Sequence, residues 1–339
     1  MSGRLKKIFI FLIFAALAVF LLSLGKVYDW HELEFGVTFS KKQAVDLGLD
    51  WPAVYLGILD ELGVKKIRLS AYWNEIEKTP GVYDWHDLDW QVRLAGEKGA
   101  DVILAVGGRL PRWPECHWPD WAGDLSDKKR EEEILDYIRA TVMRYKDEKA
   151  ISAWQVENEP FLSHFGECPE LDAAFLDREI ALVKSLDPRP AVVTDSGELS
   201  IWVPAARRAD IFGTTMYRDT YSSHLKKYVH YPITPDFFKI KKNIVSFFAS
   251  PAKWIVIELQ GEPWCPVPFQ YASEEERGRT MDAEKFKETI RFARETGFKE
   301  FYLWGAEWWY WEKARGNGAI WEIAKGLFGG SKSLLSQEK

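Results

Sequence analysis

Two apolar segments of the sequence end in acidic residues of a kind that can do acid and base chemistry. The first, ISAWQVENEP at residues 151–160, passes from a strand-like apolar run to Asn158 and Glu159 just before a proline. The second, KWIVIELQGEPW at residues 253–264, runs from an apolar stretch straight into Glu258. Two carboxyl groups in opposite protonation states can supply a proton and an electron pair to one reaction. We therefore take Glu159 and Glu258 as candidate catalytic residues.

The segments that carry these acids belong to a repeating pattern of helices and strands. Three similar joins, ELGVKKIRL, EKGADVILA and ETGFKEFYL, each place a glycine suited to a helix C-cap ahead of an apolar strand. Eight alternating units in a chain of 339 residues predict an α/β fold, a single-domain (β/α)₈ TIM barrel, rather than an open doubly wound sheet. The predicted strands are Phe35–Phe39, Lys66–Ser70, Val102–Val106, Ile151–Val156, Ala191–Thr194, Ile211–Thr215, Trp254–Ile257 and Phe301–Trp304, and the predicted helices are Leu88–Lys98, Lys129–Tyr145, Leu171–Leu186, Phe237–Phe248 and Ala283–Thr296.

Polar side chains gather where the predicted strands end. In a parallel barrel the chemistry occurs at the carboxyl ends of the strands, which meet at one face. All of these residues are therefore expected to point into one bowl. They are Arg68 in the second strand, Gly107 to Arg109 after the third, Asn158 and Glu159 at the fourth, Asp195 after the fifth, Tyr217 after the sixth, Glu258 at the seventh and Trp304 at the eighth.

With these residues in place, the chain resembles the clan A glycoside hydrolases, which include the cellulase-like and mannanase-like enzymes of family 5. The resemblance rests on Asn-Glu-Pro at the fourth strand, on a glutamate 99 residues later at the seventh, and on RLSAYWNEIEKTPGVYDWHDLD, residues 68–89, which is similar to the clan's second βα loop. Many family 5 members carry a histidine motif after the third or sixth strand, where this chain has VGGRLPRW and TTMYRDTY.

The resemblance implies a role for each candidate residue. Glu159 would be the acid/base, Glu258 the nucleophile, and Asn158 the contact to the sugar 2-hydroxyl. Ordinary packing is as good an interpretation as sugar stacking for Trp264 and Trp118, which lie outside the eighth strand. The other candidate substrate-binding residues are Arg68 and Tyr217, which would keep the nucleophile ionised, Trp304, which would stack on the sugar, and Trp264 and Trp118.

The function that follows is a retaining glycosidase acting on a carbohydrate, with O-glycosidic bonds, most often β-linked, as its target. In the clan geometry the two carboxyls are about 5 Å apart, which implies double displacement through a glycosyl enzyme. No cofactor is predicted, since no glycine-rich phosphate loop follows the first strand. The alternative is a membrane-tethered, non-catalytic carbohydrate-binding protein on the same barrel, because a fold does not prove an activity.

Several nearby residues compete with these assignments. Glu157 and Glu262 each lie close to a candidate in the same loop, and for both we expect a surface or supporting position. His117 and His164 lie in the loops after the third and fourth strands and are left unassigned. We predict no metal site, because neither histidine belongs to a metal-binding spacing pattern. Asp195 is expected to cap its loop.

The N-terminal segment differs in composition from the rest of the chain. Arg4, Lys6 and Lys7 precede an uncharged apolar run at residues 8–24. This run is about the minimum length that spans a bilayer, so it indicates an uncleaved anchor or a cleaved signal peptide, with the rest of the chain outside the cytoplasm. The net charge of −6 argues against nucleic acid as a partner. The predicted regions are residues 1–26 as signal anchor or signal peptide, 27–328 as the catalytic domain and 329–339 as a polar tail.

Three cysteines all fall in loops on the presumed catalytic face. Pairing is expected for a protein outside the cytoplasm. Cys116 and Cys168 follow neighbouring strands and are therefore the better candidates for a disulfide, which leaves Cys265 free.

Overall fold

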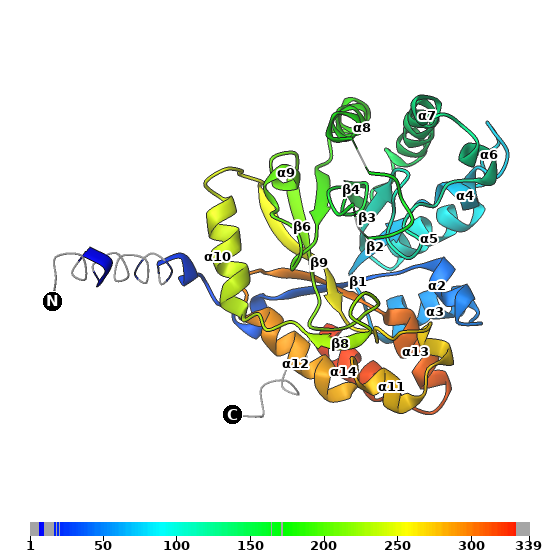
Figure 1. Cartoon of the computed structure of the whole chain (residues 1–339). Coiled ribbons are helices and arrows are strands. Elements are labelled where there is room, and N and C mark those ends of the chain that lie inside the picture. Colours follow the sequence, from blue (N-terminus) through cyan, green and yellow to red (C-terminus); the bar gives the residue numbers. More distant parts are fainter. Residues whose placement is uncertain are drawn as a thin grey trace.

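The computed structural model describes residues 7–9, 17, 19, 21–163, 165–170 and 172–329. Its centre is a closed barrel of eight parallel strands, as predicted (Figure 1). The barrel strands are β1 (Glu34–Thr38), β2 (Lys66–Ser70), β3 (Asp101–Val106), β4 (Ile151–Val156), β5 (Ala191–Asp195), β6 (Ile211–Met216), β9 (Lys253–Gln260) and β10 (Glu300–Trp304). Around the barrel they follow the order β1-β10-β9-β6-β5-β4-β3-β2.

Each predicted strand corresponds to one strand of the barrel, and the bounds differ by at most three residues. The agreement has a physical basis, because strands covered on both faces are near-continuous apolar runs that stand out in a sequence. The glycines of the three joins, Gly63, Gly99 and Gly297, have φ of 70°, 66° and 77°. These left-handed angles end a helix at little cost only in glycine.

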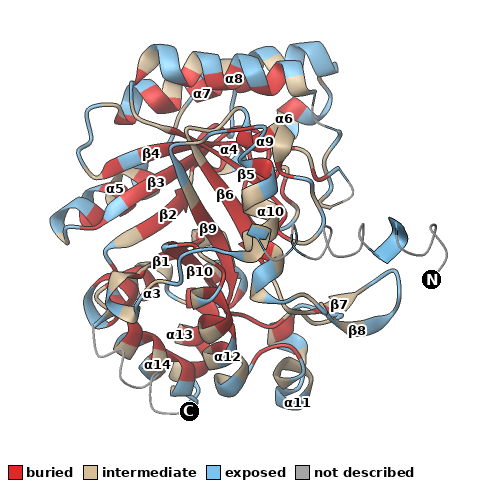
Figure 2. Cartoon of the chain, turned by 90° about the vertical axis from the view of Figure 1, so that its left-hand side faces the viewer, coloured by how far each residue is buried: buried red, intermediate tan, exposed pale blue. Residues whose placement is uncertain are grey.

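Helices form the outer layer of the barrel. On α7, the buried residues Ile134, Ile138 and Val142 recur every four positions and face the strands. Figure 2 shows the exposed outer surfaces of α7 and α8. The helices are α2 (Lys41–Asp46), α3 (Trp51–Leu56), α4 (Trp73–Ile76), α5 (His86–Glu97), α6 (Asp120–Gly123), α7 (Asp127–Tyr145), α8 (Ala173–Leu186), α9 (Val203–Ala206), α10 (Pro235–Val245), α11 (Glu274–Gly278), α12 (Ala283–Arg294), α13 (Ala306–Ala314) and α14 (Ala319–Phe328), with shorter turns η1 (Trp30–Glu32), η2 (Gly57–Glu61) and η3 (Phe269–Tyr271).

The loop after β6 contains a hairpin that the sequence analysis did not predict. Its strands, β7 (Asp219–Ser222) and β8 (Lys227–His230), pair antiparallel. Both strands are short and mostly polar, and no Asn-Gly or Asp-Gly dipeptide marks the turn between them. The usual hairpin signals are therefore missing.

The interior of the barrel is a packed core. At the end opposite the polar bowl, Lys66 forms ion pairs with Glu34 at 3.1 Å and with Glu300 at 3.3 Å. The candidate catalytic residues lie at the other end of this core, at the carboxyl ends of the strands. The core residues are Ile103, Ala153, Val192, Ile255, Ile257 and Tyr302.

The predicted membrane segment, residues 8–24, lies largely outside the described residues. Within the ranges that the structure describes, no helix combines the length and apolar character needed to cross a bilayer. The end of the segment contacts the barrel domain, because Asn243 Nδ2 of α10 donates to the carbonyls of Leu22 at 2.7 Å and Leu24 at 3.1 Å. The predicted polar tail is described only at Gly329.

Candidate active site

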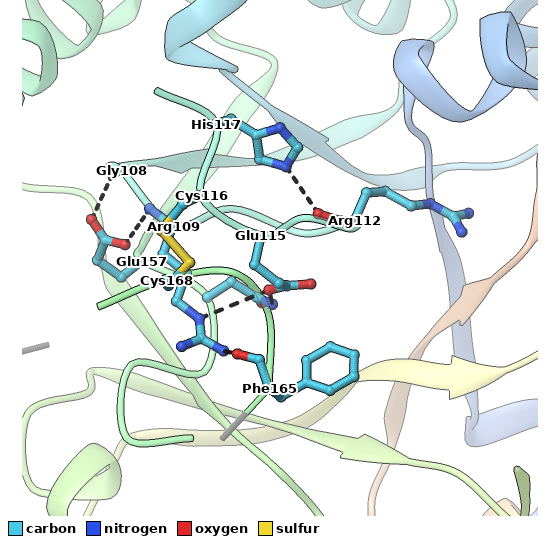
Figure 3. The surroundings of a disulfide bond; sticks show 10 residues. Gly108, Arg109, Arg112, Glu115, Cys116, His117, Glu157, Phe165 and Cys168 are labelled. Carbon is cyan, nitrogen blue, oxygen red and sulfur yellow. Dashed lines mark hydrogen bonds and ion pairs between the residues drawn. A yellow bond between two sulfur atoms is a disulfide. The ribbon is translucent and has the colours of Figure 1, made fainter. Parts of the chain in front are cut away.

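The chain turns sharply where β4 ends, and this turn separates two neighbouring glutamates. Glu157 and Glu159 have φ of 59° and 42°, angles that crowd the Cβ of any residue but glycine. The Glu157 carboxylate accepts hydrogen bonds from the backbone N–H groups of Gly108 and Arg109, at 2.7 and 2.6 Å (Figure 3). The Glu159 side chain contacts a different element, β6, where Thr215 Oγ1 donates to its Oε1 at 3.4 Å. Glu157 therefore supports the loop after β3, and Glu159 faces the site.

A β-bulge in β9 directs Glu258 into the same site. Thr214 pairs with Val256 but Thr215 pairs with Glu258, so β9 has one residue more than β6 at this point. Ile257 packs in the barrel interior, and strict alternation would turn the next side chain outward. The extra residue allows two consecutive side chains to face inward, a common use of bulges beside active sites.

Both carboxylate oxygens of Glu258 have a fixed partner. Arg68 Nη1 donates to Oε1 at 2.7 Å, and the Tyr217 hydroxyl donates to Oε2 at 2.9 Å. Arg68 is fully buried, and its remaining nitrogens donate to Gln155 Oε1 at 2.8 Å and Asn158 Oδ1 at 2.7 Å. One guanidinium therefore orients the nucleophile candidate and the neighbouring amide together.

Glu159 has the environment of a proton donor. It is 5% exposed, and burial raises its pKa well above the ordinary value of 4.5. The negative charge of Glu258 raises this pKa further, because two close carboxylates resist being ionised together. Asp195, at the end of β5, also contributes, and it accepts a hydrogen bond from the Ser196 N–H at 3.0 Å, consistent with the loop cap expected for it.

Trp304 ends β10 with one face of its ring covered. The Arg112 guanidinium lies 3.9 Å from the ring centroid, and Trp304 is 8% exposed. Trp304 Nε1 donates to Glu262 Oε1 at 2.8 Å, and Arg112 pairs with both Glu262 and Glu307. Glu262 thus supports Trp304 and Arg112, the kind of position expected for it.

The other two tryptophan candidates lie in different places. The Trp264 ring meets Tyr217 edge-on at 5.2 Å and contacts Phe165 at 5.8 Å, so it is brought to the site. Trp118 is not brought together with them, because its ring lies under the Arg130 guanidinium of α7, at 4.2 Å. Phe165, from the loop after β4, was not selected from the sequence, since no strand end or motif marks it.

A disulfide joins the loops after β3 and β4. Cys116 and Cys168 are bonded, with their Cα atoms 5.4 Å apart (Figure 3). This is the pair that the loop positions favoured. Cys265 is free. His117, beside the disulfide, is buried and its Nε2 contacts the Arg112 carbonyl oxygen at 2.9 Å. His164 lies outside the described residues.

The loop after β3 also contributes a third carboxyl group that was not selected from the sequence. Glu115 is 4% exposed, and its Oε2 accepts a hydrogen bond from Asn158 Nδ2 at 2.8 Å. Arg109 Nε lies 3.9 Å from the same oxygen (Figure 3). Burial raises the pKa of Glu115 to about 8, and the charge of Glu258 contributes in the same direction. No strand end marks Glu115, and its position depends on the fold of the loop.

Comparison with known sequences gives a partial match. No protein-family model matches the chain. A β-galactosidase, BgaA, from Clostridium cellulovorans is 22% identical over 165 residues, which cover 43% of this chain and 25% of that protein. The chain thus spans about a quarter of the length of this curated relative.

Comparison with solved structures gives matches over most of the chain. Xylanase 10B from Thermotoga maritima matches with a TM-score of 0.59 and 12% identity over 91% of this chain and 98% of the xylanase. An exo-β-1,4-mannosidase from an Opitutaceae bacterium matches with a TM-score of 0.54 and 16% identity, over 80% of this chain and 51% of that one. A β-galactosidase from a psychrophilic Marinomonas matches with a TM-score of 0.54 and 14% identity, over 80% and 54%. The chain therefore has the barrel fold of the clan A glycoside hydrolases that its sequence resembles.

Proposed function

We propose that the chain is a retaining glycoside hydrolase that cleaves β-linked bonds of an oligo- or polysaccharide. The observation that carries this proposal is the arrangement around Thr215. Thr215 pairs with Glu258 across the strands, and its hydroxyl contacts Glu159, so both glutamates adjoin the same residue in space. Glu159 has a strongly raised pKa, as a proton donor requires, and Glu258 is held by the Arg68 guanidinium, as a nucleophile requires.

In the first step, Glu159 protonates the glycosidic oxygen while Glu258 attacks the anomeric carbon. The bond to the leaving group breaks, and a glycosyl ester forms on Glu258. The raised pKa of Glu159 favours the protonated form that this step requires. Arg68 and Tyr217 hold the attacking carboxylate in position.

In the second step, Glu159 acts as a base because it has given up its proton. It removes a proton from water, whose oxygen attacks the anomeric carbon and releases Glu258. Two inversions in sequence give a product with the configuration of the substrate. The proton taken from water restores Glu159 to its starting state.

We further propose that the enzyme works outside the cytoplasm, tethered by residues 8–24 or released by cleavage after them. The basic residues Arg4, Lys6 and Lys7 before this run support that orientation. The disulfide between Cys116 and Cys168 supports an oxidising compartment.

The proposed activity is tested with a panel of aryl glycosides and β-linked polysaccharides, with the product configuration determined by NMR. Glu258→Ala is expected to abolish turnover, and added azide should partly restore it and give a glycosyl azide of inverted configuration. Glu262→Ala is the matched control and should keep more activity. Carbohydrate binding without turnover by the wild type would favour the non-catalytic alternative. An active Glu258→Ala beside an inactive Glu262→Ala would refute the assignment on β9.

A further inference from the structure

Glu115 is a buried carboxyl group that the two-step mechanism does not use. Its side chain reaches the amide of Asn158, which is itself tied to the guanidinium of Arg68. A polar group with 4% exposure is normally retained for a structural or a functional reason. Arg109 Nε lies 3.9 Å away, farther than a hydrogen bond, so the contact that ties Glu115 to the site is the one to Asn158.

The loop holds Glu115 in a strained conformation. Its φ of 74° lies in the left-handed region, which costs a non-glycine residue about 1 kcal/mol. The backbone is fixed on both sides, since Glu115 N–H donates to the Arg112 carbonyl and its own carbonyl accepts from Leu110 N–H, each at 2.8 Å. The next residue, Cys116, is in the disulfide. Gly166 lies so close that a Cβ there would be 2.8 Å from the Glu115 side chain. Strain of this kind is typical of functional positions.

Glu115 is linked to the nucleophile candidate through Asn158 and Arg68. The guanidinium binds Glu258 through Nη1 and Asn158 through Nη2, each at 2.7 Å. The Asn158 amide therefore lies about one guanidinium width from the attacking oxygens. A sugar whose anomeric carbon faces Glu258 would therefore place its adjacent ring substituent toward this amide. Glu115 and Asn158 Nδ2 are the groups that meet there.

The chemistry of the two groups suits a hydroxyl. Asn158 Oδ1 accepts from Arg68 and one Nδ2 hydrogen is donated to Glu115, so the second Nδ2 hydrogen is the donor that the amide offers. The Glu115 carboxyl has acceptor capacity beside this donor in either protonation state. A hydroxyl can accept from the amide and donate to the carboxyl at the same time, whereas a hydrogen or a methoxy group would leave at least one partner without its hydrogen bond.

We propose that Glu115 is a substrate-binding residue that selects, together with Asn158, a free hydroxyl on the ring carbon next to the anomeric carbon. This inference rests on the proposed glycosidase activity. The loop after β3, closed by its disulfide, then has a role in recognition of the substrate.

The test uses the aryl β-glycoside that the wild type hydrolyses fastest, and its analogue without the adjacent hydroxyl. The measured quantity is the ratio of kcat/KM for the two substrates, which cancels their intrinsic reactivities when variants are compared. Glu115→Ala should lower this ratio by about 10- to 100-fold, the effect of one lost hydrogen bond to a substrate hydroxyl. Glu115→Gln keeps an acceptor oxygen and should retain part of the ratio. Glu77→Gln, at a buried glutamate bonded to Trp73 Nε1 at 2.7 Å, is the matched control and should leave the ratio unchanged.

Thermal melting shows whether each variant is folded. If Glu115→Ala does not fold, the isosteric Glu115→Gln and its smaller loss of ratio decide the question. Equal losses on both substrates in a folded variant would overturn the role of Glu115 while leaving the proposed activity intact. If the wild type turns over no glycoside, the proposed function itself is wrong.

Discussion

Glu159→Ala is expected to separate substrates by the quality of their leaving groups. A sugar leaving group needs a proton as its bond breaks, whereas a dinitrophenolate is stable enough to leave without one. Removal of the acid should therefore slow formation of the glycosyl enzyme from an unactivated disaccharide and have little effect on the dinitrophenyl glycoside.

The structure favours the upper part of the range for this loss. A general acid contributes about 10² to 10⁴ in rate. Two other carboxyl groups that influence Glu159 are already engaged, since Glu115 is bonded to Asn158 and Asp195 to the backbone of its own loop. Because these hydrogen bonds hold both groups in place, we expect a loss of about 10³ to 10⁴ on the disaccharide and of less than about 10 on the dinitrophenyl glycoside.

The raised pKa of Glu159 also predicts the pH dependence. The proton is lost as the pH rises through that pKa, so kcat/KM of the wild type should fall on the basic side. With the activated substrate, Glu159→Ala should lack the part of this fall that belongs to the acid.

The assay is pre-steady-state measurement of the glycosylation rate with both substrates. Glu157→Gln is the matched control, because this glutamate lies two positions earlier and binds the loop after β3 instead. Any loss it causes should be equal for the two substrates. Equal losses in Glu159→Ala would remove it from the acid role, and a leaving-group effect in Glu157→Gln would transfer that role.

Three further predictions concern stability and the loops. Folding raises the pKa of Glu115 from 4.5 to about 8, so the folded state holds this proton more tightly and the resulting stability is lost as the pH rises through that window. Compared with Glu115→Gln, the wild type should lose about 1.4 kcal/mol of unfolding free energy per pH unit between these two pKa values, as measured by urea denaturation. A difference in unfolding free energy that does not change with pH would contradict the raised pKa of Glu115. Gly197→Ala should destabilise the fold by about 1–3 kcal/mol, because the new Cβ would lie 2.0 Å from the Thr215 carbonyl oxygen; an unchanged unfolding midpoint would count against this contact. Thiol labelling of the denatured protein should find one free cysteine, and three after reduction of the Cys116–Cys168 bond. Three free thiols without reduction would argue against an oxidised loop pair.

The barrel could be predicted because its signals are local. Apolar runs and the glycines that end helices identify the strands, and parallel strands place their carboxyl ends on one face. From that geometry, Arg68, Tyr217 and Glu258 were expected on one face, and in the structure Arg68 and Tyr217 each donate a hydrogen bond to Glu258. The β7–β8 hairpin lacked such signals and was missed.

The sequence by itself determined which residue types stand at the ends of the strands, because that depends only on where apolar runs stop. It did not determine which side chains enter the site. The left-handed turns that separate Glu157 from Glu159, and the bulge that turns Glu258 inward, are set by pairing with neighbouring strands. Glu115 depends on a loop closed by a disulfide to a distant segment. A change in backbone direction at one residue reverses the face of a side chain, and only contacts between parts far apart in the chain hold such a change in place.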